Sequence, residues 1–368
     1  MSDRRTPATF SARLRDHLER LFPGEQLVEL VPLAPDTGAT SGVVKAAGYG
    51  LPVRVVLADD AGGRREVVWR TASANEYGHD RRSDRAAGAL QAFDDFGATP
   101  RHVAALDVGL VARDGSLISV RDGDEPYLIT EFAPGSIYAD DLRRIAERRT
   151  VEARDLARLD VLAHYLAQLH VPAPGGAVAY RRAIRDLVGH GEGVFGVIDA
   201  YPDDTPGASR SRLVEIEARC VSWRARLRDH HARLARTHGD FHPFNIVFGE
   251  DSELAVLDAS RGGVGDPADD LTALAVNFLL FALGREGAWQ GGLGALWHRF
   301  WATYLGVRPD RELLAVAPPF FAWRALVVCS PRFYPDLAPS DRDRLLSFAE
   351  SALEAHHLDP AAADGVFR

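Results

Sequence analysis

Asp240, Asn245 and Asp258 have side-chain types and a spacing that suit metal-assisted chemistry. Two short apolar runs flank the polar turn 249–253 and predict a β-hairpin. Antiparallel pairing about that turn sets Phe248 near Leu254, so Asn245 at the start of one strand lies beside Asp258 at the end of the other. An amide oxygen and a carboxylate held side by side are hard oxygen ligands suited to Mg²⁺.

Asp240 lies five residues before Asn245, on the chain that leads into the hairpin. A carboxylate at that position is close enough to orient a hydroxyl group beside a bound metal ion. The alternative interpretation is a surface hairpin whose Asp and Asn residues serve only as turn formers.

The motif His-Gly-Asp at 238–240, followed by Asn245, Asp258 and the run Gly-Asp-Pro-Ala at 265–268, resembles a known family. It is similar to the aminoglycoside phosphotransferase and choline kinase branch of the protein-kinase-like fold, in which the catalytic loop has the pattern H-G-D-x-x-x-x-N. The resemblance implies that Asp240 is the catalytic base, and that Asn245 and Asp258 are Mg²⁺ ligands.

Composition describes an ordinary globular protein of 368 residues, with 46% hydrophobic and 26% charged residues. A net charge of −9 argues against a general nucleic-acid binder, which needs a basic face. The N-terminal residues lack the apolar core of a secretory signal, and the longest apolar run, 271–283, is too short to span a bilayer. Cys220 and Cys329 have no metal or redox spacing. We therefore expect a reduced, cytoplasmic protein without a membrane or nucleic-acid partner.

A glycine and hydroxyl turn at 36–42 resembles the nucleotide-covering loop of the family. Gly38 and Ser41 are its candidate phosphate-binding residues, because short side chains let backbone N–H groups approach phosphate. An ordinary hairpin turn is the alternative.

On the predicted strand 65–71 the family places a phosphate-binding lysine, and this chain has Arg70 there. Lys45 is the only lysine in the chain, so we expect Arg70 to substitute for the phosphate-binding lysine of the family. Lys45 itself is the alternative cation.

The predicted helix 79–96 stands where the family has an acid that orients this cation. Asp84 is the first candidate and Asp80 the second. The alternative for each, which is favoured for either residue taken alone, is a solvated carboxylate in the first turns of a helix. The predicted strand 126–132 is similar to the hinge between the lobes. The resemblance implies that the Glu131 carbonyl and the Ala133 N–H face the adenine edge.

The second half of the chain predicts mostly helices. Amphipathic or apolar stretches indicate helices within 160–170, 213–234, 271–283, 289–304 and 341–358. Carboxylates near the hairpin and in the segment 180–204 predict an acceptor with a positive charge or several hydroxyls, unless they only cap helices and keep the surface soluble. These carboxylates are Glu192, Asp203, Asp204, Asp266, Asp269 and Asp270.

Together these features predict an α+β, two-lobed protein-kinase-like fold. A small antiparallel-sheet lobe at 1–134 binds the nucleotide, and a mostly helical lobe at 135–368 carries the catalytic and acceptor sites. The predicted function is Mg²⁺-dependent transfer of the ATP γ-phosphoryl group to a hydroxyl of a small metabolite or antibiotic. The rival interpretations are a protein kinase and a non-catalytic nucleotide-binding protein. The resemblance leaves the acceptor and the oligomeric state open.

Overall fold

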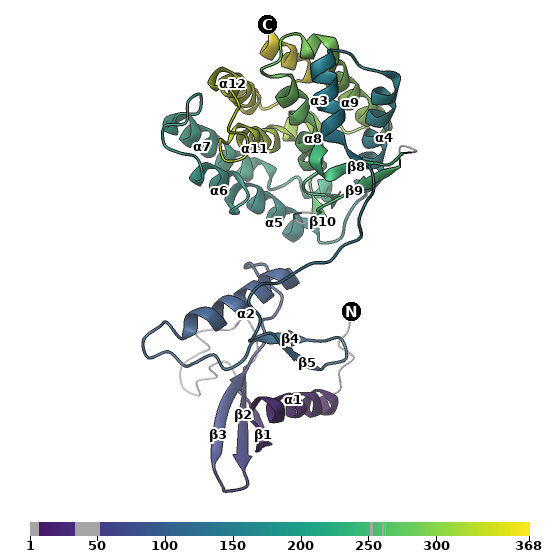
Figure 1. Ribbon diagram of the computed structural model, residues 1–368. Coiled ribbons are helices and arrows are strands. Elements are labelled where there is room, and N and C mark those ends of the chain that lie inside the picture. Colours follow the sequence, from purple (N-terminus) through teal and green to yellow (C-terminus); the bar gives the residue numbers. More distant parts are fainter. Residues whose placement is uncertain (1–6, 34–51, 251–252, 260, 262) are drawn as a thin grey trace. The chain divides into compact units, whose positions relative to one another are not determined.

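The chain forms two compact units, Met1–Thr130 and Glu131–Arg368 (Figure 1). The computed structural model describes residues 7–33, 52–250, 253–259, 261 and 263–368. Among the described helices, none is long and apolar enough to cross a membrane.

The first unit contains a three-stranded antiparallel sheet covered by a helix. The strands are β1 (Glu25–Pro32), β2 (Val53–Asp59) and β3 (Arg64–Trp69), in the order β1-β2-β3. Helix α1 (Pro7–Leu21) packs Leu14 and Leu18 against β2, where they form a small core with neighbouring apolar side chains of the sheet. The buried side chains of Val55 and Leu57 lie two residues apart on β2, so they share the face that contacts α1, and their burial fixes the register of this central strand.

The rest of the first unit is a helix and a short hairpin. Helix α2 (Arg82–Phe96) lies within the range predicted at 79–96, and β4 (Gly109–Val111) pairs with β5 (Leu117–Ser119). The strand predicted at 126–132 is wrong, because these residues form no regular structure. Strand propensity yields a strand only where a partner strand is in place.

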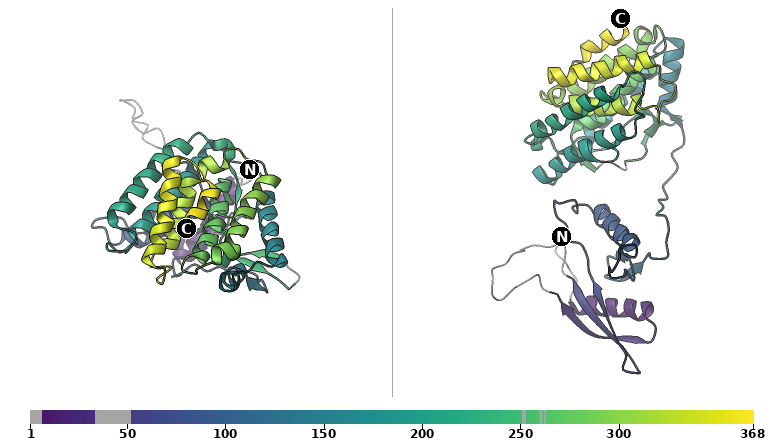
Figure 2. Two further views of the ribbon diagram at one scale, coloured as in Figure 1. Left: turned by 90° about the horizontal axis from the view of Figure 1, so that it is seen from above. Right: turned by 90° about the vertical axis from the view of Figure 1, so that its left-hand side faces the viewer.

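The second unit is mostly helical, as predicted. Its α-helices are α3 (Tyr138–Arg148), α4 (Ala153–Leu169), α5 (Gly176–Gly189), α6 (Val194–Asp199), α7 (Arg210–Leu227), α8 (Pro267–Ala282), α9 (Gly294–Val307), α10 (Leu313–Val316), α11 (Pro318–Cys329) and α12 (Pro339–Ala355). A π-helical turn, Trp289–Leu293, precedes α9. Figure 2 shows the C-terminal helices beside the α5–α7 region, where α11 packs on α6 and α7.

Helix α8 is the centre of the second unit. Asp266 caps its N-terminus through its side chain, Pro267 occupies the first turn, and nearly every residue after them is buried. Because the helix is apolar on all sides, it packs against α3, α9 and α11 at once. The first turn of α8 is therefore fixed within the core, and it presents acidic side chains to the neighbouring loop.

Two small sheets lie beside this helical core. Strands β6 (Ser136–Ile137), β8 (Ile246–Phe248) and β9 (Leu254–Val256) form one sheet, and β7 (Ala235–Thr237) pairs with β10 (Gly263–Gly265) in the other. The chain between β7 and β8, together with the chain between β9 and β10, carries the residues that the sequence predicts for catalysis.

Candidate active site

The hairpin β8–β9 has the predicted register. Phe248 pairs with Leu254, and the N–H of Leu257 donates to the carbonyl of Asn245 at 2.8 Å. Asp258 follows directly, so the hairpin brings it to the end of the ladder where Asn245 precedes β8. Asp258 is exposed and has a φ of 52°, a left-handed conformation that Asp tolerates better than most residues.

Asn245 and Asp258 fit a small, hard cation. The Asn245 side-chain nitrogen donates to the Asp240 carbonyl at 3.1 Å, which orients the amide and leaves its oxygen for a ligand. Within the described part of the chain, no group of three or more His, Cys, Asp or Glu side chains could hold a metal ion. A carboxylate and an amide without further protein ligands are the set that Mg²⁺ uses when substrate phosphates and water complete its shell.

Asp240 is a buried carboxylate, 7% exposed, and both of its oxygens contact cationic side chains. Oδ1 accepts a hydrogen bond from Arg324 Nη1 at 2.7 Å. Oδ2 lies 2.6 Å from Arg261 Nη2 and 3.5 Å from His242 Nε2. Burial raises the pKa of Asp240, but the hydrogen bond from His242 and the charges of Arg324 and Arg261 outweigh it. The pKa of Asp240 therefore lies well below its usual range, and the side chain is ionised at neutral pH.

Sequence reasoning did not find Arg324, which lies on α11 and is 84 residues from Asp240. Its guanidinium is buried over the ring of Trp323, at 3.9 Å from the ring centroid. One signal was present: Arg324 is the single charged residue in the otherwise apolar helix Pro318–Cys329. A charge in such a helix is stable only with a partner inside the protein.

The backbone of residues 238–245, the predicted catalytic loop, is held by Asp270 in the first turn of α8. Its two carboxylate oxygens accept the N–H groups of His238 and Gly239, each at 2.7 Å, and His170 Nε2 lies 3.2 Å from Oδ2. His170 is in turn tied to the Tyr304 hydroxyl at 2.8 Å. Burial raises the pKa of Asp270, but the bonds from His170, His238 and Gly239 lower it below its usual value. His170, the residue that follows α4, therefore helps to hold Asp270 in place.

The prediction that Asp266 and Asp270 face the acceptor is wrong. Both carboxylates are at most 1% exposed. Asp266 caps α8 and binds Arg233 through two hydrogen bonds of 2.8 and 2.9 Å. Asp269 is half-buried and accepts a 2.6 Å hydrogen bond from Arg324. Acidic residues at a helix N-terminus are favoured by the helix dipole, which explains their clustering after the hairpin.

Glu192 is the predicted acceptor-side carboxylate that lies beside the catalytic loop. Its Oε2 is 3.7 Å from Arg261 Nε, and its carbonyl accepts the Trp323 indole N–H at 3.0 Å. Arg261 thus lies between an exposed carboxylate and the buried carboxylate of Asp240.

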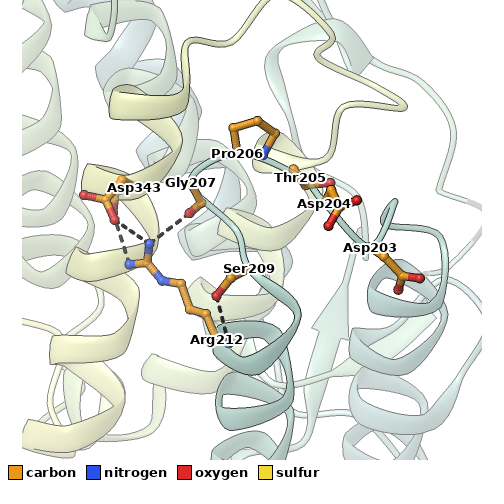
Figure 3. Close-up of a pocket in the computed structure, with 8 residues that line it drawn as sticks. All are labelled: Asp203, Asp204, Thr205, Pro206, Gly207, Ser209, Arg212 and Asp343. Atoms are coloured by element: carbon orange, nitrogen blue, oxygen red, sulfur yellow. Dashed lines mark hydrogen bonds and ion pairs between the residues drawn. The ribbon is translucent and has the colours of Figure 1, made fainter.

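Asp203 and Asp204 belong to a different surface hollow, of about 600 Å³ (Figure 3). Arg212 lies across this hollow and donates to Asp343 Oδ1 at 2.6 Å and to the Gly207 carbonyl at 2.9 Å. None of the residues that line the hollow is among those that contact Asp240. Of the six carboxylates predicted for the acceptor, Glu192 is therefore the exposed one that is linked to Asp240, through Arg261.

In the first unit, Arg70 follows β3 and its guanidinium lies 5.4 Å from the centroid of the Phe96 ring, at the end of α2. Asp84 lies in the first turn of that helix, where its carboxylate accepts the N–H of Arg81. An α-helix rises about 1.5 Å per residue, so Asp84 and Phe96 are roughly 18 Å apart along the axis of α2. The structure therefore does not bring Arg70 and Asp84 together. Gly38, Ser41 and Lys45 lie outside the described residues.

Glu131 and Ala133 lie in the irregular segment that enters the second unit. Glu131 is exposed and Ala133 is half-buried. Gly135 follows with a φ of 143°, and a Cβ at this position would approach the Phe248 carbonyl oxygen to 2.4 Å. Only glycine allows the chain to pass so close to β8 in this conformation.

The sequence profile of the phosphotransferase enzyme family matches residues 53–309. The chain therefore belongs to this family and is a phosphotransferase. Its α+β architecture, with a small antiparallel sheet in the first unit and a helical second unit, is the protein-kinase-like fold that the sequence motifs predicted. No curated protein matches the chain.

Solved structures of small-molecule kinases resemble the chain only weakly. Aminoglycoside phosphotransferase APH(3'')-Id from Streptomyces rimosus is 17% identical, with 85% of this chain and 98% of that chain covered and a TM-score of 0.35. Choline kinase LicA from Streptococcus pneumoniae is 11% identical, with 94% and 99% covered and a TM-score of 0.33. A glucosamine kinase is 15% identical, with 92% and 95% covered and a TM-score of 0.39. Similarity at this level does not identify an acceptor.

We predict that Asp270→Asn lowers both stability and turnover, because an amide cannot accept two N–H groups and bind His170 as a charge does. Breaking a buried, charge-assisted network costs about 3–5 kcal/mol of unfolding free energy. A misplaced catalytic loop lowers kcat by roughly 10-fold or more. Thermal unfolding and phosphoryl-transfer kinetics well below the melting temperature measure the two effects.

Asp266→Asn is the matched control for Asp270→Asn. Asp266 is equally buried at the start of the same helix, and its partners Arg233 and Tyr180 lie outside the catalytic loop. We expect this variant to lose stability and to keep the kcat of the folded enzyme. Equal turnover in the two variants would show that Asp270 does not position the loop.

Proposed function

We propose that the protein transfers the γ-phosphoryl group of ATP to a hydroxyl group of a small molecule. The observation that carries this proposal is that one loop and one hairpin gather Asp240, Asn245 and Asp258 at the same end of a short sheet. An ionised carboxylate beside a pair of hard oxygen ligands is the minimal set for in-line phosphoryl transfer.

In this proposal Asp240 accepts a hydrogen bond from the acceptor hydroxyl and orients its oxygen toward the phosphorus. Asn245 and Asp258 would hold Mg²⁺, which when bound would neutralise charge on the phosphate oxygens. The low pKa of Asp240 favours orientation over early removal of the proton. This suits a loose transition state, in which the acceptor oxygen forms little bond to phosphorus.

For the nucleotide we propose residues 1–134 as the binding lobe and 135–368 as the catalytic and acceptor lobe. Arg70 draws charge from the phosphates that are not transferred, and backbone groups at Gly38 and Ser41 approach them. The Glu131 carbonyl and the Ala133 N–H bind the adenine edge.

The short chain between the metal residue and the next helix favours a small acceptor over a protein. Helix α8 begins at Pro267, nine residues after Asp258. So short a segment leaves no room for the long activation segment with which a protein kinase presents a peptide. A non-catalytic nucleotide binder would need neither the base nor its buried cationic partners.

A kinase screen tests the proposed function. Radiolabelled ATP and Mg²⁺ are incubated with the protein and a library of small hydroxyl compounds, including amino sugars, amino alcohols and antibiotics. We expect one chemical class to become labelled in a metal-dependent reaction. Metal-dependent labelling of peptides alone would support the protein-kinase interpretation, and no transfer to any acceptor would support the non-catalytic one.

We predict that Asp240→Asn lowers kcat by roughly 10²–10⁴ while ATP affinity stays nearly unchanged, because Asp240 contacts the acceptor and not the nucleotide. Steady-state kinetics and calorimetric titration with a non-hydrolysable ATP analogue measure the two quantities. Near wild-type turnover in this variant would remove Asp240 from the mechanism.

Asp258→Ala is expected to weaken Mg²⁺-dependent nucleotide binding more than Asn245→Ala, since a charged ligand binds the cation more strongly than a neutral amide. Calorimetry with the same analogue, with and without Mg²⁺, gives the ranking. Losses of equal size in the two variants would contradict the assignment of Asp258 as the principal ligand.

Arg70→Ala is expected to lose most of the turnover, whereas Arg70→Lys keeps a measurable fraction because an ammonium on the same strand still reaches phosphate. Lys45→Ala is the control and is expected to be mild. Kinetics on the three variants decide between the two cations. A silent Arg70→Ala beside an inactive Lys45→Ala would assign the role to Lys45.

A further inference from the structure

Arg324 joins the base to two other groups of the second unit. It is 4% exposed, and its two terminal nitrogens donate to Asp240 Oδ1 at 2.7 Å, to the Gly239 carbonyl at 2.8 Å and to Asp269 Oδ1 at 2.6 Å. The Trp323 ring supports the guanidinium on one face. A planar fork with three acceptors and a stacked ring has one available orientation.

The contacts of Arg324 fix the Asp240 side chain as well as the loop backbone. One nitrogen binds the carboxylate of Asp240, and the other binds the carbonyl of the preceding residue, Gly239. These two bonds restrict rotation of the carboxylate about its own side chain. A carboxylate held in this way offers its second oxygen, Oδ2, in a defined direction.

The two arginines on Asp240 differ in how firmly they are held. The Arg324 side chain is 5% exposed and has three acceptors, whereas the Arg261 side chain is 28% exposed and lies between Asp240 and the exposed Glu192. Removing Arg324 from Oδ1 would leave a buried carboxylate oxygen without its charged hydrogen-bond donor. Arg261 can exchange Oδ2 for Glu192 or water at a much smaller cost.

From this difference we propose that Arg324 is a positioning residue for phosphoryl transfer. It holds Oδ1 of Asp240 through the reaction, so that Oδ2, after Arg261 moves away, receives the acceptor hydroxyl. Asp269 anchors Arg324 from the other side. This inference rests on the proposed function.

The test uses Arg324→Lys and Arg324→Met in the full-length protein, with the acceptor identified by the kinase screen. We expect kcat to fall roughly 100-fold in Arg324→Met, because a base displaced by about 1 Å loses its alignment. Arg324→Lys keeps one charged contact and should recover about a tenth of the wild-type kcat. The KM for ATP should stay within about twofold in both variants.

Arg158 provides the matched control. It is a second buried arginine of the same unit, paired with Asp141 at 2.5 Å and lying over the Phe248 ring. Arg158→Lys and Arg158→Met should lower the melting temperature about as much as the Arg324 variants do. Their kcat should stay within about twofold of the wild type.

Unchanged kcat in Arg324→Lys and Arg324→Met, or equal loss of kcat in the Arg158 pair, would overturn the positioning role. Should Arg324→Met fail to fold, Asp269→Asn decides, because it loosens the anchor and leaves Arg324 in place. We expect about a 10-fold loss of kcat there, and an unchanged kcat would overturn the proposal. A wild-type protein that transfers phosphate to no acceptor refutes the proposed function itself, which is a different result from an active enzyme insensitive to Arg324.

Discussion

A buried negative charge needs partners within the protein, and the partners of Asp240 determine how the active site is built. Arg324 comes from α11, Arg261 from the chain after β9, and His242 from the catalytic loop itself. An ionised carboxylate without these groups would be strongly disfavoured in the interior. The charge of Asp240 therefore holds α11 and the chain after β9 against the loop that carries Asp240 and His242. The same contacts that make its burial possible also fix its direction.

The first turn of helix α8 contacts both the backbone of the loop before Asp240 and the side chain of Arg324. Consecutive residues of an α-helix point about 100° apart, so Asp269 and Asp270 face different neighbours. Asp270 binds the backbone N–H groups of the catalytic loop, and Asp269 binds Arg324. The positive end of the helix dipole favours both carboxylates. Because α8 is buried almost throughout, this turn cannot shift without disturbing the core.

The sequence was informative where the constraint is local. The turn after Phe248 determines the register of the hairpin, so Asn245 and Asp258 could be placed together from spacing alone. Arg324 could not, because 84 residues separate it from its partner and no periodicity links them. The acidic residues of α8 were misinterpreted for a related reason. Whether a carboxylate of α8 faces solvent or the loop at 238–240 depends on how α8 packs in the second unit. The sequence of the helix alone does not predict that packing.

The low pKa of Asp240 limits what this residue can do. In the proposed role, a carboxylate that keeps its hydrogen bond to Arg324 is a poor acceptor of a full proton, so it would not store the acceptor proton early in the reaction. In a loose transition state the acceptor oxygen carries little positive charge until the phosphoryl group is nearly transferred, and early proton removal contributes little. A fixed, ionised carboxylate that orients the hydroxyl is then sufficient. The firm hold on one oxygen of Asp240 is thus more consequential than its basicity, because orientation is what the chemistry requires.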